Sequence, residues 1–207
     1  QSYLTGYIAA LVSSAKKEDM QYANAENKIG LIAAQEYPVM NNVIFPGFVE
    51  GAQKAVPGTT VDFRIVGNWY DATKGAELAK SMYKNGIDVI LPICGGASQG
   101  VIAAAKEMGF YITWFDNNGF SKAPGYIVSS SVMAQKRMAK EITIEYLNNL
   151  TDFGSAKTVG IREGYIDFIQ DDPEYIKIIP EDIRKKMETV VSSIKDGSLI
   201  LPSLWKN

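Results

Sequence analysis

Between Lys28 and Ser130 the sequence alternates short apolar runs, which are typical of buried strands, with segments of helical spacing. The apolar runs predict strands at Lys28–Ala33, Val61–Val66, Asp88–Ile93 and Tyr111–Phe115. The segments after them predict helices at Gly47–Val56, Asp71–Asn85 and Ser98–Met108. Strands separated by helices at this spacing indicate βαβ units. The pattern therefore predicts an α/β fold built on a parallel sheet flanked by helices.

The segments on either side of this unit contain too few strands to form a sheet of their own. The chain opens with a helical apolar pattern, and a long helix is expected from about Val132 to Leu150. The remaining elements are expected as a strand at Thr158–Arg162, a Tyr- and Asp-rich loop to Pro180, a charged helix at Glu181–Lys195 and a last short strand at Leu199–Pro202. We interpret 28–130 as one complete lobe, 1–27 as the end of another lobe with its crossover, and 131–207 as the return segment that completes that other lobe. Residues after Val132 are then expected to pack with the opening helix.

Composition excludes most common catalytic machinery. The chain has no histidine and a single cysteine, Cys94, which removes the usual zinc sites, every His-based triad and any intrachain disulfide. The formal net charge of −2, without a basic block, disfavours a nucleic-acid partner. No apolar run reaches the ~18 residues that a membrane-spanning helix needs. No cofactor or metal is expected.

Polar and aromatic side chains follow the predicted strands, at the edge of the sheet where ligands of open α/β folds bind. These loops offer amides, aromatic rings, glycines and a few carboxylates, without a nucleophile and base pair. Such a set suits a flat ring that is stacked and hydrogen-bonded along its polar edge. The candidate ligand-binding residues are Gln35, Tyr37, Asn68, Trp69, Tyr70, Gly95, Asp116 and Asn117.

Each of these features also has a purely structural interpretation. Trp69 could cover the start of a helix, Gly95 and its neighbour could only allow a tight turn, and Asp116 could cap the following turn. Cys94 fits a small buried hydrophobic residue. The glycines match neither of the two phosphate-binding spacings, Gly-x-x-x-x-Gly-Lys-Ser/Thr and Gly-x-Gly-x-x-Gly, so a nucleotide-phosphate site is weakly supported.

Several motifs follow one another along the sequence: Ser2–Leu11, Lys28–Gly30, Pro38, Gly47–Phe48 with Gly51, Gly67–Gly75, Gly86–Ile90, Gly95–Gly96 with Gly100–Val101 and Ala104–Ala105, and Asp116 ahead of Val128–Ser130. Taken in order, they resemble the basic membrane protein (BMP) family of substrate-binding lipoproteins. The resemblance implies a type I periplasmic-binding-protein fold of two α/β lobes that serves an ABC importer. It further implies a ligand similar to those of the family's purine-nucleoside receptors or of its riboflavin-binding branch.

The sequence departs from this family in two respects. The family begins with a further segment, including an Asp- and Asn-bearing loop and an aromatic residue that sandwiches the base, which this sequence does not contain; much of the first lobe is thus expected to be missing. Met133 stands where nucleoside-binding members have a lysine, and Asp116–Gly119 replaces the usual Asp-x-Asp-Gln. A lost lysine removes a donor to ribose hydroxyls, so a larger flat ring with a flexible polyol becomes a rival ligand.

The resulting hypothesis is a periplasmic or cell-surface binding protein, held to the membrane by a lipid anchor outside this sequence and partnered by an ABC permease. Trp69 would stack on the ring, Tyr37 and Tyr70 would form second walls, and Gln35, Asn68, Asp116 and Asn117 would read polar edges. Gln35, Trp69, Gly95 and Asp116 are expected within one ligand's length of each other. Two alternatives stay open: a small α/β enzyme using Asp116 or Asp71 as a base, and the effector domain of a transcription regulator.

Overall fold

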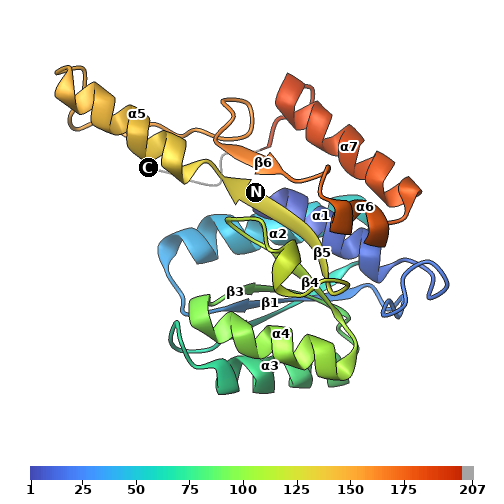
Figure 1. The fold of residues 1–207 in the computed structure, drawn as a ribbon. Helices are drawn as coiled ribbons and strands as arrows, with labels where there is room; N and C mark the ends of the chain where they lie inside the picture. The colour runs from blue at the N-terminus through green and yellow to red at the C-terminus, as the bar shows by residue number, and fades with distance from the viewer. Residues whose placement is uncertain (202–207) are drawn as a thin grey trace.

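A single six-stranded sheet forms the centre of the molecule (Figure 1). The computed structural model describes residues 1–201. The strand order is β2-β1-β3-β4-β5-β6; the first five strands pair in parallel, and β6 pairs antiparallel with β5. The bounds are β1 Lys28–Ala33, β2 Thr60–Ile65, β3 Val89–Ile93, β4 Tyr111–Trp114, β5 Ile127–Met133 and β6 Ile166–Phe168. The predicted α/β class with a parallel sheet is confirmed.

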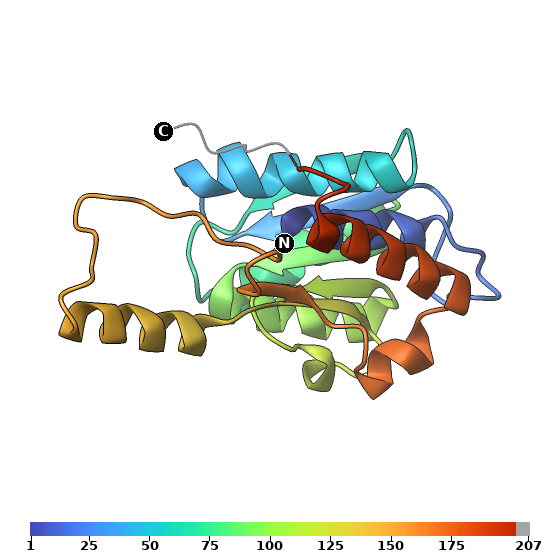
Figure 2. The same ribbon diagram turned by 90° about the horizontal axis from the view of Figure 1, so that it is seen from above.

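Helices cover both faces of this sheet. Helices α3 and α4 pack together on one face, α1 and α2 lie on the other, and α7 contacts α1 from outside (Figures 1 and 2). The helices are α1 Ser2–Ser13, α2 Phe45–Ala55, α3 Ala72–Lys84, α4 Ser98–Met108, α5 Gln135–Leu147, α6 Pro173–Ile178 and α7 Glu181–Asp196, with a π-helical turn at Met40–Ile44 before α2. Within the described residues, no helix is long and apolar enough to cross a membrane.

Helix α1 is buried on nearly every side because it lies between the sheet, α2 and α7. Gly6 allows the close approach of α2, since a Cβ there would overlap the backbone carbonyl of Phe48. Gly51 of α2 plays the reciprocal role against the carbonyl of Tyr3. This explains why an apolar helix opens the chain without a clear polar face.

The carboxyl-terminal third corrects several predictions. The helix predicted from Val132 begins only at Gln135, because β5 continues to Met133 through pairing with β6. The strand predicted at Thr158–Arg162 is wrong: this stretch is loop and turn, in which the carboxylate of Glu163 accepts a hydrogen bond from the Gly160 amide. The strand lies further along, at β6.

The segment expected to be loop before Pro180 contains both β6 and α6. Helix α6 begins where the Asp172 side chain accepts a hydrogen bond from the Glu174 amide, with Pro173 in the first turn. Residues 199–201 do not form the predicted last strand. Pro202 lies outside the described residues.

Helix α5 and the loop after it extend away from the rest of the molecule (Figures 1 and 2). The helix has no buried residue. The exposed large apolar side chains of the helix and loop are Met138, Ile142, Ile144, Tyr146, Leu147, Leu150 and Phe153. Helix α7 packs on α1, but α1 itself packs on the sheet of 28–130 and β6 pairs with β5 in that sheet, so these two segments do not leave the central unit, whereas α5 covers none of the described core.

Candidate functional site

The loops after β1, β2, β3 and β4 lie at one edge of the sheet, because these strands run in parallel. Two of the loops meet through aromatic rings: the centroids of Tyr37 and Trp69 lie 6.3 Å apart, with an angle of 38° between the planes. The third loop packs beneath them, since a Cβ at Gly95 would lie 2.8 Å from the Trp69 carbonyl oxygen. The Ala97 amide donates to that carbonyl at 3.3 Å. Tyr37, Trp69 and Gly95 are therefore brought together.

The Trp69 side chain lies against the Gly95 turn and remains 41% exposed. Its neighbour Tyr70 is 80% exposed. The indole thus combines the structural role of covering a turn with a face open to the outside. Gly95 adopts a φ of 58°, which its turn requires and which other residues rarely tolerate.

Asn68 has a structural role that its position in the sequence did not reveal. Its Oδ1 atom accepts hydrogen bonds from the amides of Tyr70, at 3.0 Å, and Asp71, at 2.8 Å. Asp71 in turn caps α3 by accepting from the Lys74 amide. Of the two polar side-chain atoms of Asn68, the oxygen is thus occupied, and the amide nitrogen has no hydrogen-bond partner within residues 1–201.

Asp116 follows β4 in a backbone conformation that is unusual for its residue type, with a φ of 72°. Its carbonyl accepts a hydrogen bond from the Met133 amide at 3.2 Å, so β5 holds the loop in place. Burial raises the pKa of its carboxyl group, and the nearby Gln1 side chain, acting as a hydrogen-bond donor, partly offsets that rise. The half-buried carboxylate is therefore poorly solvated in its charged form.

Tyr37, one ring of the aromatic pair, lies close enough to the Asp116 loop to be affected by its charge. Burial and the negative charge of Asp116 both raise the pKa of the Tyr37 hydroxyl. Gln35, two residues earlier, is exposed at the same edge. The Oδ1 atom of Asn117 accepts a hydrogen bond from the Trp114 indole at 3.1 Å.

Two residues near the site were not predicted from the sequence. The Gln1 side chain donates to the Ser131 carbonyl at 3.2 Å, next to the Asp116 loop, although it lies more than a hundred positions away in the chain. The apolar run predicts only a strand position for Trp114, yet its side chain contacts the loop that carries Asp116. The three-residue spacing between Trp114 and Asn117 was the one local signal available.

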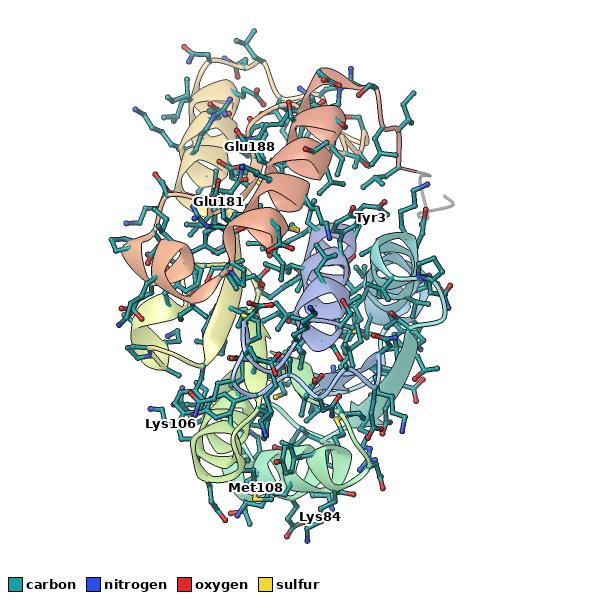
Figure 3. All side chains as sticks on the ribbon, turned by 90° about the vertical axis from the view of Figure 1, so that its right-hand side faces the viewer. Tyr3, Lys84, Lys106, Met108, Glu181 and Glu188 are labelled. Atoms are coloured by element: carbon teal, nitrogen blue, oxygen red, sulfur yellow. The ribbon has the colours of Figure 1, made fainter. Side chains whose placement is uncertain are left out.

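The opposite edge of the sheet carries a groove of about 660 Å³, which lies between the loop before β1 and the last turns of α3 and α4. Figure 3 views the molecule from that side, with Lys84 and Met108 labelled at the ends of these helices.

No cluster of three or more His, Cys, Asp or Glu side chains able to hold a metal occurs in the described part of the chain.

Comparison with known proteins gives a consistent family. The family described as "ABC transporter substrate-binding protein PnrA-like" matches residues 1–199. Basic membrane protein A of Borreliella afzelii is 28% identical over 204 residues, which are 97% of this chain and 58% of that protein. Basic membrane protein A1 of Borrelia garinii subsp. bavariensis is 29% identical over 204 residues, with 97% and 56% covered. The chain thus spans somewhat more than half the length of these relatives.

Solved structures show the same fold at low identity. An ABC transporter solute-binding protein from Aeropyrum pernix K1 matches with a TM-score of 0.77 and 19% identity, covering 98% of this chain and 64% of the other. A transcriptional activator of the comK gene from Bacillus halodurans matches with a TM-score of 0.75 and 20% identity, covering 98% and 65%. The fold is therefore shared by binding proteins of transporters and by a regulator, and it does not separate the two by itself.

The family match decides what the fold leaves open. It covers nearly the whole chain, including the edge where Tyr37 lies beside Trp69 and close to Asp116. This protein belongs to the Bmp family of PnrA-like ABC transporter substrate-binding proteins.

Proposed function

We propose that the chain supplies one side of the ligand site of an ABC importer's binding protein, and that the ligand is a heteroaromatic compound, either a purine nucleoside or riboflavin. The observation that carries the proposal is the tilted Tyr37–Trp69 pair beside the half-buried carboxylate of Asp116. An aromatic face and a poorly solvated acceptor suit a flat ring that bears N–H or O–H donors.

Stacking would recognise the flat ring of the ligand, and hydrogen bonds would recognise its polar edge. A ring stacked on Trp69 gains about 0.5 to 1.5 kcal/mol beyond simple burial. A ligand lacking the donor for Asp116 would leave that acceptor unpaired, which costs about 1 to 3 kcal/mol. Tyr37 and Tyr70 serve as second walls, and Gln35 and the side-chain amide nitrogens of Asn68 and Asn117 read the polar edge.

The two-lobe organisation belongs to the same proposal. Residues 28–130 form the lobe that carries this edge; α1 and α7 pack on it, and α5 with the loop after it belongs to a second lobe that closes over the ligand. The exposed apolar residues of α5 and the greater length of the relatives support this division. Such closure would bury the exposed part of Trp69.

A binding protein of this family would act outside the cytoplasm and deliver its ligand to the permease of the transporter. We place it in the periplasm or on the cell surface, anchored by lipid through a segment beyond this sequence. Its work would be capture and release, without making or breaking a covalent bond.

The test is a ligand screen on the protein in its natural length. Riboflavin, adenosine and guanosine are titrated by calorimetry, and D-tagatose serves as a sugar control. Mass spectrometry of any ligand released from the purified protein identifies what it carries. Saturable binding of one heteroaromatic compound, together with no binding of the sugar, is the expected result. Binding of the sugar alone would overturn the proposal.

A further inference from the structure

Trp114, the last residue of β4, lies beneath the loop that carries Asp116. The side chain is 8% exposed, and its Nε1–H donates to Asn117 Oδ1 at 3.1 Å. Gly119 rests directly on the indole, where an added Cβ would overlap the ring. The Lys122 ammonium group lies 5.4 Å from the ring centroid. The indole therefore contacts the loop at Asn117 and Gly119, and the turn after the loop at Lys122.

Strand β5 holds the same loop from the other side. The Ser130 hydroxyl accepts a hydrogen bond from the Gly119 amide at 3.0 Å, and the Met133 amide donates to the Asp116 carbonyl at 3.2 Å. Between these two points Asp116 keeps its φ of 72°. A backbone held in a sparsely populated region needs surroundings that over-determine it.

We propose that Trp114 is a positioning residue, which fixes the 116–119 loop so that the Asp116 carboxylate stays half-buried and directed toward the Tyr37–Trp69 pair. The ligand contact of Asp116 rests on the proposed function, whereas the positioning of its carboxylate does not. In this arrangement Asn117 orients the loop through the indole, and its side-chain oxygen does not read the ligand.

A purely structural role for Trp114 gives a different expectation. If the indole only filled the core, phenylalanine would keep most of the packing, and the environment of Asp116 would not change. If the Nε1–H bond sets the loop, its loss loosens the loop and lets water reach the carboxylate. The pKa of Asp116 would then fall from its raised value toward the ordinary 3.8.

The experiment measures the Asp116 titration by carbon-13 NMR in the protein and in Trp114→Phe. Asn117→Ala breaks the same hydrogen bond from its exposed end and covers the case in which Trp114→Phe does not fold. Tyr111→Phe is the matched control: it removes a hydroxyl that accepts from the Tyr22 amide at the other end of the same strand. A lower pKa of Asp116 in both test variants, and an unchanged one in the control, is expected. An unchanged pKa of Asp116 in the test variants overturns the positioning role.

Ligand affinity is measured beside the titration, using riboflavin and adenosine as probes in calorimetry. For a probe that the protein binds, Trp114→Phe should weaken affinity at least tenfold, and Tyr111→Phe less than twofold. An unchanged affinity in Trp114→Phe would overturn the link between loop position and binding. If the unaltered protein binds neither probe, the proposed ligand class fails, and the Asp116 titration alone decides the positioning role.

Discussion

Two aspartates at opposite edges of the sheet have pKa values raised by the same cause and yet occupy very different surroundings. Asp88, directly before β3, is fully buried, and its Oδ2 atom accepts a hydrogen bond from the Asn24 amide at 2.7 Å. Asp116, after β4, is half-buried at the edge where Tyr37 and Trp69 meet. Asp88 holds a loop against the sheet through its hydrogen bond to Asn24. Asp116 is only partly buried, so its carboxylate remains accessible to a ligand. A raised pKa alone would not have separated the two roles.

The loop held by Asp88 shows how complete its structural role is. Asn24 also donates from its side chain to the Gly86 carbonyl at 2.8 Å, and the Tyr22 amide donates to the Tyr111 hydroxyl at 3.3 Å. Asp88 Oδ1 is buried and has no partner at hydrogen-bond distance within residues 1–201, although the nearby Ser13 hydroxyl partly lowers the pKa of Asp88. The charged form is therefore incompletely compensated. Burial raises the pKa of Asp88 to about 6, because the loss of solvation outweighs the hydrogen bonds it accepts.

The largest effect is expected for Asp88→Asn. The raised pKa means that the folded state binds a proton more tightly than the unfolded state does. The contribution of protonated Asp88 to the free energy of unfolding is thus fully present below pH ~4 and is lost as the pH rises through about 6. The difference of about two pH units corresponds to up to about 3 kcal/mol. Urea unfolding at pH 4 and pH 7.5 should show the variant gaining stability relative to the parent only at the higher pH.

Glu18→Gln is the control for this experiment, since Glu18 is an exposed acidic residue in the same loop and does not act on the pKa of Asp88. Its free energy of unfolding should follow the same pH dependence as the parent. If Asp88→Asn were destabilising by the same amount at both pH values, the charge of Asp88 would not be what limits stability.

The next effect concerns the open edge, and the change is Trp69→Ala. The indole is 41% exposed, so its removal should shift the melting temperature by only a few degrees. Loss of stacking and ring burial should weaken ligand binding by about 2 kcal/mol, or roughly thirtyfold. Calorimetry gives the affinity and a thermal melt gives the stability. A variant that binds as tightly as the parent would transfer the stacking role to Tyr37 or Tyr70.

A smaller effect on stability is expected for Asp116→Asn, which makes the same chemical change as Asp88→Asn at the other edge. Its free energy of unfolding at pH 7.5 should change by less than about 1 kcal/mol, because water already reaches part of this carboxylate. Affinity for the ligand should fall more than stability does. A stabilisation as large as that of Asp88→Asn would place Asp116 among the structural aspartates and end the comparison.

The alternation of strands and helices could be predicted because each element carries its own local signal. The apolar run of β1 and the Asn85–Gly86 end of α3 are examples. Strand β6 has only three residues and exists because β5 continues to Met133, a pairing between segments more than thirty positions apart. Local periodicity contains no information on such a contact. The charged α7 was predicted because its apolar residues recur on one face.

For the candidate site, the parallel order was enough to place Tyr37, Trp69, Gly95 and Asp116 in loops at the same edge. It did not reveal which side-chain atoms the loops themselves use. Asn68 accepts two backbone hydrogen bonds, and Asn117 accepts one from an indole, so both amides are partly occupied. The preference of Asn for turns made this foreseeable for Asn68. The Gln1 contact beside Asp116 depends on the packing of distant segments.

The smallest effect is expected for Tyr37→Phe, which tests whether this residue acts through its ring or its hydroxyl. The variant keeps the ring that lies 6.3 Å from Trp69 and removes only the group whose pKa burial and Asp116 raise. Stability should stay within about 0.5 kcal/mol of the parent. If Tyr37 is a wall of the site, affinity should change less than threefold, whereas Tyr37→Ala should weaken it several times more. A tenfold loss in Tyr37→Phe would instead show that the hydroxyl donates to the ligand, and that Tyr37 and Asp116 read its polar edge together.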